Sequence, residues 1–233
     1  MMKKKTIIIG SKWLFVALLL LGTYKLMNSR TYQLFGNITK QVETTQKVVA
    51  LTFDDGPAEN VNIILPLLAK YNAKATFFLI GEEIEKYPEE TKNIAKEGHQ
   101  IGNHSYSHHR MVFKSLSYYK AEIEKTDVLI RNAGFNGEID VRPPNGKKLI
   151  GLPYYLNKQH RDTITWNLEP DSYFNTVSDK VNDVKENIKP GSIILIHPMY
   201  DDTDKVRQTI EGILQALSNK GYTFITVNEL QDI

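Results

Sequence analysis

The chain has 233 residues, of which 41% are hydrophobic and 24% are charged, a balance typical of a globular domain rather than a disordered chain. The net charge is +2, but the first 30 residues hold six of the 29 basic residues and no acidic one. The remainder therefore holds 23 basic and 27 acidic residues, which argues against nucleic acid as a partner. The absence of cysteine excludes disulfides, thiolate zinc sites and cysteine nucleophiles.

The N-terminus combines a basic flank with an apolar run. Three lysines at positions 3–5 precede an apolar stretch, residues 6–24, that only Lys12 interrupts. The run has roughly the 20 residues that span a bilayer, and the basic flank predicts that the rest of the chain is exported. Because Gly22 and Thr23 form a poor cleavage site, we expect residues 1–28 to be an uncleaved signal anchor in the cell membrane, with the domain outside the cell. The alternatives are a cleaved signal peptide, which would leave a secreted protein, and a buried core helix, which Lys12 disfavours.

Residues 29–46 are polar and aperiodic, which predicts a short linker, and one domain follows over residues 47–233. Within it, short apolar runs alternate with longer amphipathic ones. In chain order they predict a strand at 48–53, a helix at 60–70, a strand at 74–80, a helix at 89–97, a strand at 100–103, a helix at 117–132, strands at 139–142 and 163–167, a helix at 181–188, a strand at 192–197, a helix at 205–220 and a strand at 223–227.

This alternation of about seven strands with helices predicts a parallel α/β fold. A closed or nearly closed barrel fits the strand count, and an open doubly wound sheet is the alternative. No glycine-rich phosphate loop follows the first strand, which disfavours dinucleotide binding.

Polar side chains follow several predicted strands at the point where each strand ends. They are Asp54 and Asp55 after the first strand, His104 and His108 after the third, Arg142 at the fourth, Asp171 past the fifth and His197 after the sixth. Because the carboxyl ends of barrel strands meet at one face, we expect these residues to assemble at one mouth.

The adjacent carboxylates of Asp54 and Asp55 repel each other if they are packed together without a partner. A metal ion bound by one of them resolves the conflict and leaves the other free as a base. The alternative is a turn, since Asp-Gly is a common turn pair.

His104 and His108 are four residues apart, so on a helical turn they would share a face at a spacing of about 5–6 Å that suits one metal ion. His109 could replace His108, but its spacing is a poorer match, and His99 before the strand reads as structural. A pair of solvated histidines is the alternative.

His197 ends an apolar run that must be buried, so it is either a satisfied core group or a working acid–base residue. Arg142 stands before two prolines and is either a surface cation or a group that orients a carboxylate.

Taken together and in order, these segments resemble the polysaccharide deacetylases of the NodB-homology type, carbohydrate esterase family 4. The resemblance rests on five motifs: Thr-Phe-Asp-Asp-Gly at 52–56, His-Ser-x-x-His at 104–108, Arg-x-Pro-x-Gly at 142–146, Asp171, and Leu-x-His at 195–197. It spans residues 47–230. It departs from the family at Asn145, where an aromatic residue is common, and at Ser172, where a tryptophan is usual.

The resemblance implies a distorted (β/α) barrel of about seven parallel strands. It implies one divalent metal ion, usually zinc, with cobalt or another transition metal as alternatives, held by Asp55, His104 and His108. It implies that Asp54 is the catalytic base, oriented by Arg142, and that His197 is the catalytic acid, oriented by Asp171. Leu195 would line the acetyl pocket, a backbone N–H beside Asn145 would face the oxyanion, and Trp166 or Tyr173 would fill the space of the missing tryptophan.

The implied function is metal-dependent hydrolysis of N-acetyl groups from a cell-surface polysaccharide, with release of acetate. An exported domain has the cell wall as its nearest polymer, so N-acetylglucosamine of peptidoglycan is the first expectation. Chitin oligosaccharides or an exopolysaccharide, an O-acetylated glycan and a non-catalytic glycan-binding role are the alternatives. The sequence does not set the oligomeric state.

Overall fold

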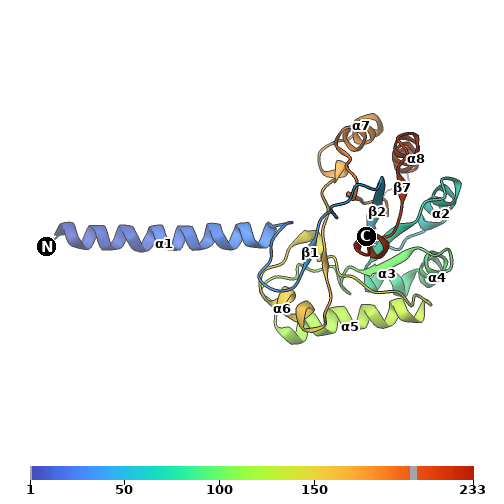
Figure 1. Ribbon diagram of the computed structural model, residues 1–233. Helices are drawn as coiled ribbons and strands as arrows, with labels where there is room; N and C mark the ends of the chain where they lie inside the picture. Colours follow the sequence, from blue (N-terminus) through green and yellow to red (C-terminus); the bar gives the residue numbers. More distant parts are fainter. Residues whose placement is uncertain (1, 200–203) are drawn as a thin grey trace.

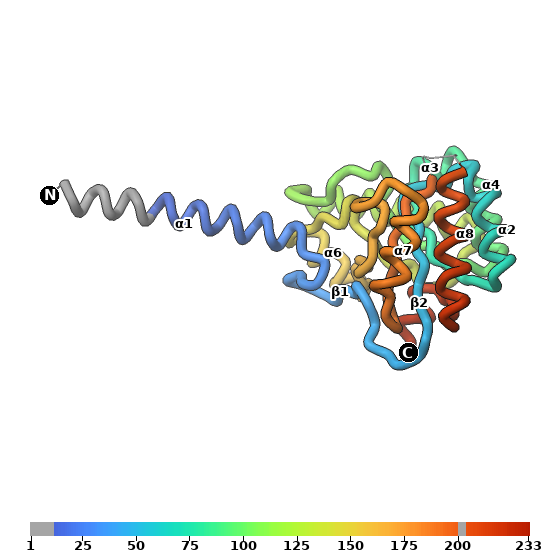
Figure 2. The backbone as a smooth tube through the Cα atoms, turned by 90° about the horizontal axis from the view of Figure 1, so that it is seen from above, coloured from blue at the N-terminus to red at the C-terminus, as the bar shows by residue number. Residues whose placement is uncertain are grey.

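The computed structural model describes residues 2–199 and 204–233, with side chains from Lys12 onward. Helix α1 (Met2–Asn28) projects away from the rest of the chain, as Figures 1 and 2 show. Among the residues described, no helix is long and apolar enough to cross a membrane, and residues 1–11 of the predicted anchor lie outside the described side chains. The transmembrane segment expected at residues 1–28 is therefore not supported by the structure.

The centre of the domain is a parallel sheet with the order β4-β3-β2-β6. Its strands are β2 (Val48–Asp54), β3 (Ala75–Leu79), β4 (Gln100–Asn103) and β6 (Ile193–Ile196). The first residues of β2 also pair with β7 (Thr223–Phe224). All these pairings are parallel, as the alternation of strands and helices predicts.

Short pairings close this sheet into an irregular ring. Val141 forms parallel bridges with Asn103 of β4 and with Thr163 of β5 (Thr163–Ile164). Leu168, in the same segment as β5, bridges Ile194 of β6. The chain of pairings therefore returns to its start, which favours the distorted barrel over the open sheet.

Three predicted strands are much shorter than expected. The strand at 223–227 keeps only Thr223–Phe224, because Thr226 caps helix α9 (Val227–Gln231). The strand at 139–142 is reduced to the bridges of Val141, because Pro143 and Pro144 follow it and cannot donate backbone hydrogen bonds. The strand at 163–167 keeps two residues. Part of the expected linker contributes to the wall, since β1 (Ile38–Thr39) pairs with β5 and Gln41 bridges Ser192.

The helices surround the strands in Figure 1. They are α2 (Val61–Lys70), α3 (Gly81–Lys86), α4 (Pro88–Lys96), α5 (Leu116–Asn132), α6 (Gly151–Lys158), α7 (Val177–Asn187), α8 (Asp204–Asn219) and α9 (Val227–Gln231), with 3-10 turns η1 (Pro144–Gly146) and η2 (Pro170–Ser172). The sequence predicts α2, α4, α5, α7 and α8 but not the short helices α3, α6 and α9.

Alternation along β2 decides which side chains enter the barrel. Val49, Leu51 and Phe53 pack outward into a core that they share with residues of α2 and α8. Ala50 faces the other way, into a cluster with Phe78, Trp166 and Leu195. Because successive strand residues face opposite sides, Thr52 and Asp54 share the inner face with Ala50.

The start of the barrel is covered by α9. The backbone N–H of Val227 donates to Thr76 Oγ1 at 2.9 Å, and that of Asn228 donates to Gln100 Oε1 at 2.9 Å. Thr76 and Gln100 belong to the first residues of β3 and β4. A substrate can therefore reach the inner side chains of the strands only from the opposite end of the barrel, where the strands have their carboxyl ends.

Candidate active site

A buried guanidinium lies beneath the carboxyl ends of the strands. Arg142 is 0% exposed, and its Nη1 donates to Asp54 Oδ1 at 2.6 Å and to Thr52 Oγ1 at 2.8 Å. Its Nη2 donates to the carbonyl oxygen of Thr165 at 3.1 Å. The guanidinium also stacks 4.0 Å from the ring centroid of Phe78. Arg142 is therefore not a surface cation, and it fixes one oxygen of Asp54.

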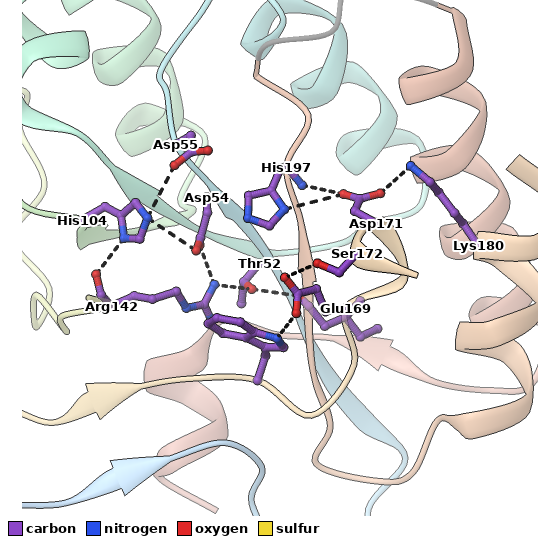
Figure 3. Close-up of polar contacts among 12 residues, drawn as sticks. Thr52, Asp54, Asp55, His104, Arg142, Glu169, Asp171, Ser172, Lys180 and His197 are labelled. Atoms are coloured by element: carbon purple, nitrogen blue, oxygen red, sulfur yellow. Dashed lines mark hydrogen bonds and ion pairs between the residues drawn. The ribbon is translucent and has the colours of Figure 1, made fainter. Parts of the chain in front are cut away.

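Asp55 meets the two predicted histidines at the mouth of the barrel. Its Oδ1 lies 3.5 Å from His104 Nε2 and 3.2 Å from His108 Nε2. The three possible ligand atoms lie within 4.8 Å of one another. Asp54 is beside them, with Oδ2 at 3.7 Å from His104 Nε2 (Figure 3).

The other ring nitrogen of His104, Nδ1, also has a hydrogen-bond partner. Nδ1 lies 2.7 Å from the carbonyl oxygen of Arg142, which can only accept, so Nδ1 carries the proton. Nε2 faces Asp55, and in a neutral imidazole it is the nitrogen that offers a lone pair to a cation. This arrangement orients a metal-binding imidazole in the way that backbone carbonyls commonly do.

Burial and charge favour the protonation states that a cation needs. Burial raises the pKa of Asp55, but the hydrogen bond from His104 and the charges of His104, His108 and His197 outweigh it and lower that pKa. Burial and the charge of His104 lower the pKa of His108, against the opposing effect of Asp55. An anionic carboxylate beside a neutral imidazole is what metal binding requires.

The two histidines do not lie on a helical turn, contrary to the sequence prediction. Residues 104–115 are not helical, and Ser105 and His108 have φ angles of 66° and 56°. The turn forms because Asn103 Oδ1 accepts the backbone N–H of Ser105 at 2.8 Å, which competes with helical bonding. The imidazoles still converge, because the left-handed turns bring His108 back toward His104.

Glu122 of α5 holds this loop, a role that the sequence does not reveal. Its Oε2 accepts the backbone N–H groups of Tyr106 at 3.1 Å and Ser107 at 2.9 Å. Its side chain also accepts the Ser107 hydroxyl. The only sequence signal is an acid at a position that the apolar spacing of α5 turns inward.

Two further histidines, His99 and His109, lie outside this cluster. His99 is buried, and its Nδ1 accepts the backbone N–H of Ala75 at 3.2 Å. Burial and the charge of Lys74 lower its pKa to about 4, so it is a neutral structural group as expected. The exposed His109 contacts Ser107 Oγ at 2.7 Å.

His197 and Asp171 form a second polar pair, and in Figure 3 the rings of His104 and His197 flank Asp54. Asp171 Oδ2 accepts the backbone N–H of His197 at 2.7 Å and lies 3.8 Å from its Nδ1. Lys180 of α7, which the sequence analysis does not single out, donates to Asp171 Oδ1 at 2.6 Å.

The contacts of this pair shift the two pKa values in opposite directions, down for Asp171 and up for His197. Burial raises the pKa of Asp171, but the hydrogen bonds from His197 and Lys180 outweigh it and lower the pKa to about 2. Burial lowers the pKa of His197, but the hydrogen bond to Asp171 and the charges of Asp54, Asp55 and Asp171 raise it overall. A cationic imidazole beside a permanent carboxylate is poised to donate a proton.

The wall of the site contains Leu195 and Trp166, which pack in one cluster inside the barrel. The indole Nε1 of Trp166 donates to Glu169 Oε2 at 2.8 Å. Ser172, which replaces the usual tryptophan, donates to Glu169 Oε1 at 2.8 Å. Tyr173 is 68% exposed and, within the described part of the chain, makes no side-chain contact with these groups, so the structure does not support its predicted place in the wall.

Asn145 lies in a left-handed turn above this wall, with φ 56° and ψ 18°, a conformation that asparagine tolerates. The backbone N–H groups of Gly146 and Lys147 donate to Pro143 and Pro144. That of Asn145 has no acceptor among the residues described. A Cβ on Gly146 would come within 2.9 Å of Trp166 Cη2, so the turn rests directly on the indole.

A family model described as polysaccharide deacetylase matches residues 41–160. A peptidoglycan-N-acetylglucosamine deacetylase of Bacillus cereus is 37% identical over 187 residues, 77% of this chain and 66% of that protein. The peptidoglycan-N-acetylmuramic acid deacetylase PdaC of Bacillus subtilis is 34% identical over 196 residues, 82% of this chain but only 40% of that protein. The chain is thus shorter than both relatives.

Solved structures give the same result. A crystal structure of a peptidoglycan N-acetylglucosamine deacetylase aligns with a TM-score of 0.76 and 34% identity, over 82% of this chain and 91% of that chain. A pseudoenzyme of carbohydrate esterase family 4 from Bacillus anthracis aligns with a TM-score of 0.74 and 27% identity, over 82% and 67%. The family model and these likenesses agree with the five sequence motifs, and the chain belongs to the polysaccharide deacetylase family.

Proposed function

We propose that the chain hydrolyses N-acetyl groups of a cell-surface polysaccharide, most directly the N-acetylglucosamine residues of peptidoglycan, and releases acetate. The observation that carries the proposal is Asp54, which is fixed through Oδ1 by the buried Arg142 and flanked by the Asp55–histidine cluster. The printed names of the two relatives support the substrate class. The pseudoenzyme with a similar fold shows that fold alone does not establish activity, and these side chains are what support catalysis by this chain.

The cluster of Asp55, His104 and His108 fits one divalent cation. It offers one carboxylate oxygen and two imidazole nitrogens within 4.8 Å, with the tautomer of His104 set by the Arg142 carbonyl. Nitrogen and oxygen donors of this kind suit zinc, with cobalt or another transition metal as alternatives. A bound cation with open positions would polarise the acetyl carbonyl and acidify a water molecule.

Glu122 provides a test of this metal site that leaves the ligands intact. Glu122→Ala removes the acceptor for the N–H groups of residues 106 and 107, so the His108 turn loses its support. We expect zinc to bind roughly 10- to 100-fold more weakly, as for other lost supports of metal ligands. Calorimetric titration of the metal-free protein measures this.

Glu124→Ala is the matched control, since Glu124 is on the same helix and contacts Tyr155 and Lys120 instead. Equal zinc affinity in the two variants would contradict the supporting role of Glu122.

Asp54 is placed to accept the proton of the attacking water. Arg142 binds Oδ1, so Oδ2 is the oxygen left facing the cluster, 3.7 Å from His104 Nε2. The guanidinium keeps the carboxylate in one orientation, so that Oδ2 is directed toward the water whose proton it accepts.

Two further groups complete the reaction. The backbone N–H of Asn145, which has no acceptor within the described part of the chain, is a donor for the oxyanion that forms when water adds to the acetyl carbon. His197, held cationic by Asp171, donates the proton that the departing sugar nitrogen needs. Leu195 and Trp166 offer the apolar surface that an acetyl methyl group requires.

Activity on defined polymers tests the proposal. The wild-type chain should release acetate from peptidoglycan, and Asp54→Asn or His197→Ala should lower the rate by at least about 100-fold, because a general base or acid typically supplies that much. Acetate release from peptidoglycan, chito-oligosaccharides and acetylated xylan, with and without a chelator, is the measurement.

Asp140→Asn is the control, since Asp140 is also a buried carboxylate but bonds to Gln100 instead of the site. Faster release from acetylated xylan would favour the O-acetyl esterase alternative, and release from chito-oligosaccharides or an exopolysaccharide alone would change the polymer. No release from any substrate by the folded, metal-loaded chain would favour a glycan-binding role.

The acid role of His197 predicts a pH effect. Activity requires protonated His197, so it is lost as pH rises through the His197 pKa. Asp171→Asn removes the bond and charge that raise that pKa but leaves the burial that lowers it. The alkaline limb of kcat/KM should therefore move to lower pH.

Lys180→Met is the comparison variant, because it removes a cation near Asp171 and leaves the His197–Asp171 contact. Its alkaline limb should not move to lower pH. If the limb of Asp171→Asn also stays in place, His197 is not the acid.

Location is a separate proposal. We infer that the domain works outside the cell, held at the cell membrane by the N-terminal segment or secreted after its cleavage. The lysines at 3–5 and the exposed apolar side chains of residues 13–21 support this. Fractionation of producing cells should place the chain in the membrane fraction or the medium, and external protease should degrade the membrane-bound form. A chain confined to the cytosol would contradict it.

A further inference from the structure

The last two residues of α1 and the three residues that follow them are bonded into the wall of the site. We call residues 27–31 the stem. The backbone N–H of Lys148 donates to the carbonyl oxygen of Met27 at 3.2 Å, and the Lys148 ammonium group donates to that of Ser29. The hydroxyl of Thr165 donates to the carbonyl oxygen of Arg30 at 2.8 Å. The stem therefore has fixed partners on two segments that border the site.

The side chain of Arg30 contacts two residues in the wall of the site, Glu169 and Trp166. Its Nη2 lies 2.8 Å from Glu169 Oε2, the oxygen that also accepts the indole N–H of Trp166. Its guanidinium lies 4.5 Å from the Trp166 ring centroid. Trp166 is thus held at its edge by Glu169 and over its face by Arg30, in a geometry typical of cation–π contacts.

Trp166 and Thr165 connect this contact to Arg142. The Arg142 guanidinium lies 5.4 Å from the Trp166 ring centroid, and its Nη2 donates to the Thr165 carbonyl. Thr165 therefore bonds to the stem through its hydroxyl and to Arg142 through its carbonyl. A shift of the stem would therefore displace Arg142, the residue that orients Asp54.

Charge gives Arg30 a second effect. Glu169 is 9% exposed. Burial lowers the pKa of Arg142, and the charges of Asp54 and Glu169 oppose that shift. Arg30 pairs with Glu169 and neutralises it. Without Arg30, the Glu169 carboxylate would compete with Asp54 for the charge of Arg142, because a buried carboxylate needs a cationic partner.

We propose that Arg30 is a positioning residue, which fixes Trp166 and Glu169 so that Arg142 stays committed to Asp54. The segment next to α1 then belongs to the catalytic site and is more than a tether. The effect on catalysis rests on the proposed function, but the Arg30–Trp166 contact does not. The family model matches residues 41–160. Arg30 precedes that region, and its partners Trp166 and Glu169 follow it.

The sequence has two tryptophans, so the full chain with Trp13→Phe keeps Trp166 as its single tryptophan and serves as the parent for the test. Arg30→Met removes the charge and keeps a long side chain. We expect the emission and near-ultraviolet circular dichroism of Trp166 to shift, and kcat to fall roughly tenfold, the lower end for a lost supporting partner, with KM little changed. The loss should fall on kcat because Arg142 and Asp54 act on proton transfer rather than on holding the polymer.

Arg30→Lys and Lys40→Met complete the design. Arg30→Lys keeps the charge but loses the planar stack, so its spectrum and kcat should lie between those of Arg30→Met and the parent. Lys40 is exposed and lies just beyond the stem, and its side chain makes no bond among the residues described, so Lys40→Met should match the parent.

Unchanged Trp166 spectra and kcat in Arg30→Met would overturn the proposal. So would a lowered melting temperature with no rescue by lysine and no change in kcat, which indicates a purely structural role. If the parent releases no acetate from any substrate, the proposed function fails; a spectral shift confined to the Arg30 variants would then still establish the contact, and its absence would refute the contact as well.

Discussion

The charge of Arg142 must be compensated inside the barrel, because a fully buried guanidinium has no water to solvate it. Asp54, Thr52 and the Thr165 carbonyl supply that compensation at 2.6–3.1 Å, and Phe78 covers one face of the guanidinium. Thr52 and Asp54 both lie on the inner face of β2. The alternation of side chains along this strand therefore fills the core on one side and directs Asp54 toward Arg142 on the other. The carbonyl of Arg142 also orients His104, so one residue orients both the proposed base and a proposed metal ligand.

This constraint separates the roles of two adjacent carboxylates. Asp54 is the last residue of β2 and faces inward to Arg142, whereas Asp55 has a φ of 67° and turns toward the histidines. Ser105, His108 and Asn145 share the left-handed conformation. Such conformations cost energy in non-glycine residues and persist where neighbouring contacts enforce them, which is common at functional sites. The proposed division into base and metal ligand thus has a backbone origin.

The sequence predicts the elements that depend on local pattern. Strand β4 lies at 100–103 as predicted, and the long helix α5 begins one residue earlier than predicted and ends where predicted. Apolar periodicity and local hydrogen bonding determine both elements. The motif residues Asp54, Asp55, His104, His108 and His197 lie together because parallel strands end at one face of the barrel. The sequence does not predict the partners Arg30, Glu122, Glu169 and Lys180, since each acts through contacts across the fold that no spacing encodes. The predicted helical turn at His104–His108 is wrong, because Asn103 Oδ1 accepts the backbone N–H of Ser105.

The central claim is that Asp55 binds metal while Asp54, committed to Arg142, does not. Anomalous diffraction at the zinc edge from crystals soaked in zinc tests it directly. The account predicts one principal ion with Asp55, His104 and His108 at about 2.0–2.2 Å and Asp54 still bonded to Arg142. An ion that draws Asp54 away from Arg142 as a ligand, or that binds elsewhere and leaves this cluster empty, would contradict it.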